Sequence, residues 1–153
     1  LTLEVVAAKG LEAKDSGGTS DPYAVVQVSK EKRKTKVIKK DLNPEWAEKF
    51  ELVVNDVNDS LKVAVWDKDL IGSDDLIGET MIPLESIVGQ KVPQKWYTLY
   101  CDSRITGEIM LGLKLPKPEG YKSNEEIIQD VTPQDVTKEA EASLNQSNNS
   151  DSS

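Results

Sequence analysis

Short apolar runs recur along residues 1–115, separated by clusters of Gly, Pro, Asp and Asn. Within several runs apolar side chains occupy every second position, as at Leu61, Val63 and Val65. This spacing places alternate side chains on one face of a β-strand, and the clusters between runs are typical of turns. The pattern predicts eight strands, at residues 1–8, 23–29, 34–39, 49–54, 61–67, 79–83, 96–100 and 107–115.

Eight short strands without long helices predict an all-β fold, an eight-stranded antiparallel β-sandwich of two packed sheets. A short helical pattern inside this region covers residues 84–88. The composition changes near Pro116 and Pro118, and residues 119–153 contain eight acids, two bases and no aromatic residue after Tyr121. Such a segment cannot bury enough apolar surface to offset its ordering entropy. We therefore expect a β-sandwich domain over residues 1–118 and an acidic, Ser/Asn-rich disordered tail over residues 119–153.

The composition argues against several functions. The 153 residues include no His, which removes the commonest general base, and one cysteine, Cys101, which cannot form a disulfide within the chain. With no Gly-rich phosphate loop or nucleophile motif either, we expect a binding module and not an enzyme. The net charge of −8 argues against a nucleic-acid partner. No apolar run reaches the 18 residues of a membrane-spanning helix, and we expect a monomeric cytoplasmic protein.

Acidic residues gather in two loops between predicted strands. Asp15 and Asp21 flank residues 16–20, and a second group follows the strand at 61–67: Asp67, Asp69, Asp74 and Asp75. If the two loops meet at one end of the sandwich, their carboxylates repel one another unless a cation binds. Calcium takes six to eight oxygen ligands from irregular loops, so this arrangement indicates a calcium site. The alternative is a set of ordinary turn aspartates that are solvated and far apart.

Three motifs in these segments resemble those of C2 domains. They are Gly10-Leu11 with Asp15 and Gly18-Thr19-Ser20-Asp21-Pro22-Tyr23, then Leu42-Asn43-Pro44-Glu45-Trp46, then Val65-Trp66-Asp67-Lys68-Asp69 with Asp75-Leu76-Ile77-Gly78-Glu79. The resemblance implies the C2 sandwich with calcium-binding loops at one end. A first loop directly after the first strand, and a closing strand at 107–115, imply the second, circularly permuted topology of the family.

The resemblance also implies a ligand set. In similar C2 domains five aspartates and a backbone carbonyl hold two or three calcium ions, and the matching positions here are Asp15, Asp21, Asp67, Lys68, Asp69 and Asp75. A serine that completes a further site in some relatives is replaced by Gly72, so a third ion stays open. Asp74 is an additional carboxylate, which either strengthens the site or repels lipid phosphate.

The function implied by the resemblance is calcium-dependent binding to anionic phospholipid, mainly phosphatidylserine, with reversible recruitment to membranes. Leu70 and Ile71 lie at the predicted tip of the third loop, where they either enter the membrane interface or pack within the loop. Residues 30–40 hold seven bases and one acid. Part of this run resembles the phosphoinositide-binding face of some C2 domains, with contacts from Lys32, Lys34, Lys36, Tyr23 and Trp66.

That second site is incomplete, because two further lysines of the family pattern appear here as Val25 and Gln27. Two alternatives to lipid binding remain for the basic run. It is either a solvated strand edge that discourages aggregation, or part of a protein-interaction module, in which the basic strand or the acidic tail docks a partner protein and calcium is incidental.

Overall fold

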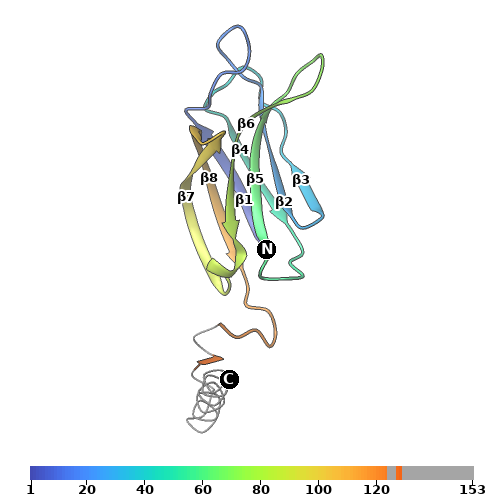
Figure 1. Cartoon of the computed structure of the whole chain (residues 1–153), viewed down its shortest axis with the longest axis vertical. Helices are drawn as coiled ribbons and strands as arrows, with labels where there is room; N and C mark the ends of the chain where they lie inside the picture. Colours follow the sequence, from blue (N-terminus) through green and yellow to red (C-terminus); the bar gives the residue numbers. More distant parts are fainter. Residues whose placement is uncertain (124–126, 129–153) are drawn as a thin grey trace, which may run out of the picture. The chain divides into compact units, whose positions relative to one another are not determined.

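The computed structural model describes residues 1–123 and 127–128, and the strands lie in a compact unit, Leu1–Lys117. The prediction of an all-β sandwich is confirmed (Figure 1). Its elements are β1 (Thr2–Lys9), β2 (Pro22–Val28), β3 (Glu31–Lys34), β4 (Glu45–Glu51), β5 (Ser60–Asp67), β6 (Asp75–Pro83), the 3-10 helix η1 (Leu84–Ser86), β7 (Gln90–Cys101) and β8 (Arg104–Leu115). The prediction of a disordered tail falls almost entirely outside the described residues.

The strands pair in the order β3-β2-β5-β6-β7-β8-β1-β4, and every pairing between them is antiparallel. A single residue pair, Glu79 with Tyr100, joins β6 to β7. The strand order therefore falls into two four-stranded halves, β3-β2-β5-β6 and β7-β8-β1-β4, that meet along a narrow seam. These halves correspond to the two layers of the sandwich.

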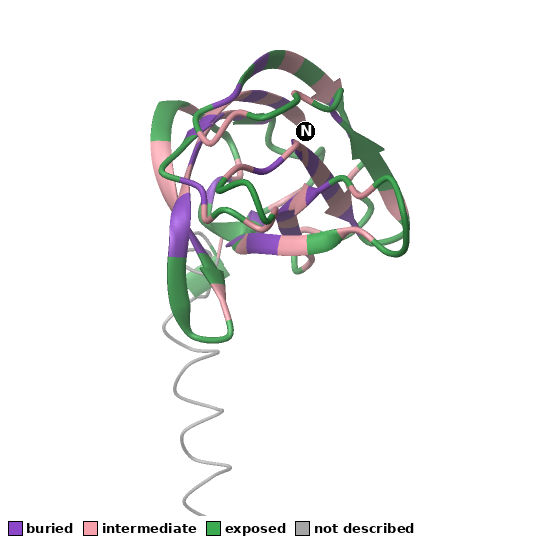
Figure 2. Cartoon of the chain, turned by 90° about the horizontal axis from the view of Figure 1, so that it is seen from above, coloured by how far each residue is buried: buried purple, intermediate pink, exposed green. Residues whose placement is uncertain are grey.

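Alternating side chains from both halves fill the core. Along β2 every second residue is buried, and the same face of β5 contributes Leu61, Val63 and Val65, each fully buried. Leu3 from β1 and Leu111 from β8 meet them from the other half. Seen from above, buried positions alternate with intermediate ones along the strands that surround this core (Figure 2). Burying each such side chain contributes about 1.5–3 kcal/mol.

The strand predicted at residues 34–39 is wrong in position, because β3 ends at Lys34. Thr35 is buried, and its N–H still donates to the Ala24 carbonyl oxygen at 2.9 Å. Its side chain replaces the second ladder bond, because Oγ1 accepts the Ala24 N–H at 2.9 Å and donates to the Lys36 carbonyl oxygen at 2.9 Å. Lys36 therefore lies beyond the strand and does not continue the face of Lys32 and Lys34.

The strand predicted at residues 49–54 begins earlier, as β4 starts at Glu45. The first part of β4 contains a bulge. Three steps along β4 oppose two along β1 between Val5 and Ala7, and Ala47 takes a φ of 52°. Trp46 is buried, but the inward position that follows it is Glu48, so the sequence gives a weak apolar pattern there.

Gly78 permits close packing of β6 against β8, and we expect Gly78→Ala to destabilise the domain by about 1–3 kcal/mol, the usual cost of overpacking. An added Cβ would lie 2.1 Å from Thr106 Oγ1 and 3.0 Å from Leu99 Cβ. Denaturant unfolding measures the loss. The matched control is Gly17→Ala, where no described atom lies within 4 Å of the added carbon; equal stability of the two variants would contradict this packing argument.

Candidate metal centre and the adjoining groove

Two loops form one end of the sandwich, the β1–β2 loop and the β5–β6 loop (Figure 1). Strand register brings the strand ends that carry these loops together, because Asp67 at the end of β5 pairs with Pro22 at the start of β2 and with Asp75 at the start of β6. The acidic loop residues therefore meet at one end of the fold, as the sequence predicts.

Three of the predicted ligands converge. Asp15, Asp67 and Asp69 each place a carboxylate oxygen within 4.8 Å of the others. Asp67 is fully buried, and its Oδ1 accepts the Asp21 N–H at 2.7 Å. Its Oδ2 is also buried and has no hydrogen-bond donor among the described residues. An unsatisfied buried carboxylate oxygen is costly, and a bound cation is one way to satisfy it.

The electrostatics of this cluster are unfavourable without a cation. Burial raises the pKa of Asp67 to about 6; the Asp21 N–H opposes this, and neighbouring Asp15 and Asp69 add to it. The pKa of Asp69 is also raised, by desolvation and by Asp75, Asp15 and Asp74. Both shifts mean that the negatively charged form is disfavoured. A divalent ion would reverse this balance, and the all-oxygen donor set fits calcium.

The other predicted ligands differ in how near they lie to the three converging carboxylates. Asp75 lies opposite Asp67 in the strand register and close enough to Asp69 to raise its pKa. Asp21 is not one of the three converging carboxylates, and its Oδ1 accepts the Lys40 N–H at 2.8 Å. The Lys68 N–H donates to the Asp21 carbonyl oxygen at 3.0 Å, which ties the two loops together.

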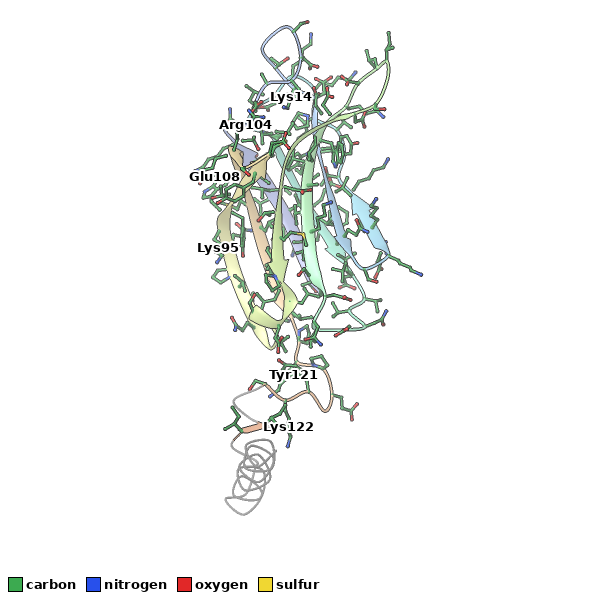
Figure 3. The ribbon with its side chains drawn as sticks, viewed as in Figure 1. Lys14, Lys95, Arg104, Glu108, Tyr121 and Lys122 are labelled. Carbon is green, nitrogen blue, oxygen red and sulfur yellow. The ribbon has the colours of Figure 1, made fainter. Side chains whose placement is uncertain are left out.

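A buried serine and an ionic contact support the first loop, and the sequence analysis missed both. Ser20 Oγ accepts the Lys14 N–H at 2.9 Å and donates to the Glu12 carbonyl oxygen at 3.1 Å. The Glu12 carboxylate accepts hydrogen bonds from Lys14 Nζ at 3.2 Å and from Arg104 at 2.9 Å, and these hydrogen bonds lower the pKa of Glu12. Lys14 and Arg104 are labelled in Figure 3, near the loop end of the domain. The one local signal was Ser20 itself, a side chain that readily bonds loop backbone.

A groove of about 580 Å³ lies beside the metal centre, over β2, β3 and β5. Three of the residues predicted to contact lipid line it: Tyr23, Lys32 and Trp66. Lys34 and Lys36 are exposed and do not line it. Lys62 and Lys68 do, and the sequence analysis assigned neither to this face. The alternation along β5 that places Trp66 and Ala64 on this face also places Lys62 there.

Asp74 lies between the metal centre and the groove. It accepts a hydrogen bond from the Tyr23 hydroxyl, and its Oδ1 accepts the Asp69 N–H at 3.0 Å. These bonds and nearby Lys68 lower the pKa of Asp74. Desolvation and the same hydrogen bond raise the pKa of Tyr23 to about 12. Asp74 is therefore a groove residue more than a member of the converging cluster.

The tip of the β5–β6 loop is apolar and exposed. Leu70 and Ile71 are 98% and 93% exposed, so neither packs within the loop. No helix within residues 1–123 and 127–128 combines the length and apolarity needed to cross a membrane.

The sequence model of the C2 domain family matches residues 1–99, and the chain belongs to this family. Synaptotagmin-4 of Arabidopsis thaliana is 43% identical over 109 residues, which cover 69% of this chain and 19% of that protein. Multiple C2 and transmembrane domain-containing protein 1 of Homo sapiens is 39% identical over 107 residues, covering 70% and 10%. The chain thus spans between a tenth and a fifth of the length of these curated relatives.

Solved structures give the same result. A C2 domain of plant Extended Synaptotagmin 1 superposes with a TM-score of 0.66 at 28% identity, covering 80% of this chain and 95% of that one. The pair of C2 domains from Extended-Synaptotagmin 2, solved with calcium bound, gives a TM-score of 0.64 at 29% identity, covering 74% of this chain and 44% of that one. The resemblance to C2 domains is confirmed.

The raised pKa of Asp67 predicts an unusual pH dependence. In calcium-free buffer the folded state binds this proton more tightly than the unfolded state, so the free energy of unfolding will rise as pH falls from 7 toward 5. We expect a gain of about 1 kcal/mol over this range, because one pKa unit corresponds to about 1.4 kcal/mol and pH 5 lies about one unit below the folded-state pKa. Denaturant unfolding at the two pH values measures it. Asp67→Asn should flatten the profile; an unchanged slope in that variant would assign the effect to other groups.

Proposed function

We propose that this C2 domain binds anionic phospholipid membranes in a calcium-dependent manner. The observation that carries the proposal is the buried Asp67 Oδ2, which has no hydrogen-bond donor in the described part of the chain and lies beside Asp15 and Asp69. The carboxylates that would hold calcium are those of Asp15, Asp21, Asp67, Asp69 and Asp75, with the Lys68 carbonyl. Two ions are proposed, and a third is an open alternative.

The role of the chain in this function is electrostatic. Without calcium, the carboxylates repel an anionic surface. Calcium, when bound, supplies positive charge and leaves coordination positions for headgroup oxygens. Phosphatidylserine offers both a carboxylate and a phosphate for this purpose. Leu70 and Ile71 would then enter the interface, because they are exposed at the tip of a metal-binding loop.

The groove is a proposed second contact for anionic headgroups, including phosphoinositides. Its support is the convergence of Lys32, Lys62 and Lys68 with the aromatic side chains of Tyr23 and Trp66. Each base near an anionic surface contributes about 1 kcal/mol. Lys34 and Lys36 would add long-range attraction from outside the groove, since both are exposed.

At the level of the whole chain, we infer a membrane-targeting module that acts by binding, not by catalysis. The proposed organisation is a C2 domain over residues 1–118 followed by an acidic tail over residues 119–153. We propose that it is a cytoplasmic monomer recruited reversibly to membranes. These statements rest on the family, in which the relatives similar to this chain include synaptotagmins and extended synaptotagmins.

Vesicle co-sedimentation across a calcium titration tests the proposal. Phosphatidylserine vesicles should retain the protein only with calcium, and phosphatidylcholine vesicles should not retain it. Absence of binding at millimolar calcium would reject the proposed function. A partner protein that binds equally with and without calcium would then favour the alternative, a protein-interaction module using the basic strand.

A further inference from the structure

The groove contains one carboxylate among its basic side chains. Lys32, Lys62 and Lys68 line it, and Asp74 is the single acidic residue among the described residues of its lining. The Asp74 side chain is only 17% exposed, so its charge is directed into the groove region and not into open solvent.

Asp74 occupies two groups that a phosphate would otherwise use. The Tyr23 hydroxyl donates its hydrogen bond to Asp74 Oδ2, and Lys68 Nζ lies 3.7 Å from the same oxygen. A phosphate entering this part of the groove would have to displace the carboxylate or lie beside it. Both arrangements are unfavourable for a dianionic phosphomonoester.

The lysines that line the groove differ in whether an acidic side chain already neutralises their charge. Lys62 forms an ion pair with Glu79 at 3.3 Å. Among the lysines of the groove, Lys32 is the one with no ion pair within the described part of the chain. The groove therefore offers less free positive charge than its lysine content indicates.

We propose that Asp74 determines headgroup specificity: its charge weakens the contact between the groove and the phosphomonoesters of phosphoinositides, and so favours phosphatidylserine, whose phosphate is a single diester. A repulsive element of this kind discriminates between ligands without new attractive contacts. This inference rests on the proposed lipid-binding function and assigns the selectivity of the same site.

The test compares Asp74→Asn with the wild-type chain on three vesicle types at saturating calcium: phosphatidylcholine alone, with phosphatidylserine, and with phosphatidylinositol bisphosphate. The measured quantity is the ratio of bisphosphate to serine affinity. Asn keeps the Oδ1 acceptor for the Asp69 N–H, so the loop is retained while the charge is removed. We expect the ratio to rise about five- to tenfold, the scale for changing one charge near an anionic surface.

Two variants separate a groove effect from net charge. Glu85→Gln removes an exposed carboxylate in η1 that does not line the groove, and should leave the ratio unchanged. Adding Lys32→Ala to Asp74→Asn should cancel the gain. An unchanged ratio in Asp74→Asn, or an equal rise in Glu85→Gln, would overturn the proposal.

Soluble inositol trisphosphate, measured by calorimetry, distinguishes the headgroup from the membrane. A matching gain for Asp74→Asn on the soluble compound places the effect in the groove, whereas a gain on vesicles alone would attribute it to surface potential and contradict the proposal. The calorimetric measurement needs no vesicles, so it tests the role of Asp74 even if the wild-type protein fails to bind phosphatidylserine vesicles. That failure is a separate result, and it would reject the proposed function.

Discussion

Replacing Asp67 with Asn will weaken calcium binding by about a hundredfold or more, because even groups outside the coordination sphere of a metal contribute ten- to a hundredfold. Asp67 is central to the cluster: it is fully buried, and its carboxylate lies with those of Asp15 and Asp69. Isothermal titration calorimetry with calcium gives the affinity. Calcium-driven binding to phosphatidylserine vesicles should be lost in parallel.

The same substitution should raise the stability of the calcium-free domain. Asn can still accept the Asp21 N–H, and its amide can donate to the neighbouring carboxylates where two charges now repel. A higher melting temperature in calcium-free buffer, together with lost calcium affinity, would exclude unfolding as the cause. Retained calcium affinity in Asp67→Asn would contradict the assignment of this cluster as the metal centre.

The double substitution Leu70→Ser with Ile71→Ser should reduce affinity for phosphatidylserine vesicles by about a hundredfold, since burial of each side chain contributes roughly 1.5 kcal/mol or more. Both side chains are almost fully exposed in the isolated domain, so the substitutions remove no internal packing. Calcium affinity without lipid and thermal stability should therefore remain near wild-type values.

Val53→Ser is the matched control, because Val53 is 63% exposed but follows β4, away from the loops of the candidate metal centre. Vesicle affinity should not change in this variant. If the double variant also binds vesicles normally, the loop tip does not enter the membrane, and attachment rests on charge alone.

The sequence predicted the strands well where local pattern decides the structure. The alternation of Leu61, Val63 and Val65 is set by burial of one face, and β5 forms within a residue of its predicted bounds. Four strands were misplaced. β6 and β7 begin at Asp75 and Gln90, before their predicted starts at residues 79 and 96. β3 ends where the Thr35 hydroxyl substitutes for a ladder bond, and β4 contains a bulge at Ala47.

The candidate site was predictable as a set of residues but not as an arrangement. Consecutive Asp74 and Asp75 face different surroundings, since the Asp74 carboxylate bonds the Tyr23 hydroxyl and the Asp69 N–H, whereas Asp75 lies opposite Asp67 in the strand register. The spacing of the aspartates in the sequence does not show that the Lys40 backbone N–H donates a hydrogen bond to Asp21 Oδ1. These choices depend on contacts between segments distant in sequence, which no local pattern encodes.

The start of β1 and the end of β8 lie at the end of the sandwich opposite the loops of the candidate metal centre (Figure 1). Leu1 is held there by its backbone nitrogen, which donates to the Leu52 carbonyl oxygen at 2.9 Å. A fluorescent label or cargo protein fused before Leu1 would accordingly face away from a bilayer held at the loops. Tandem copies joined end to end through a flexible linker would have the linker on the side away from the bilayer. Both copies would then dock on one bilayer together, and the multiplied attachment would lengthen their residence time.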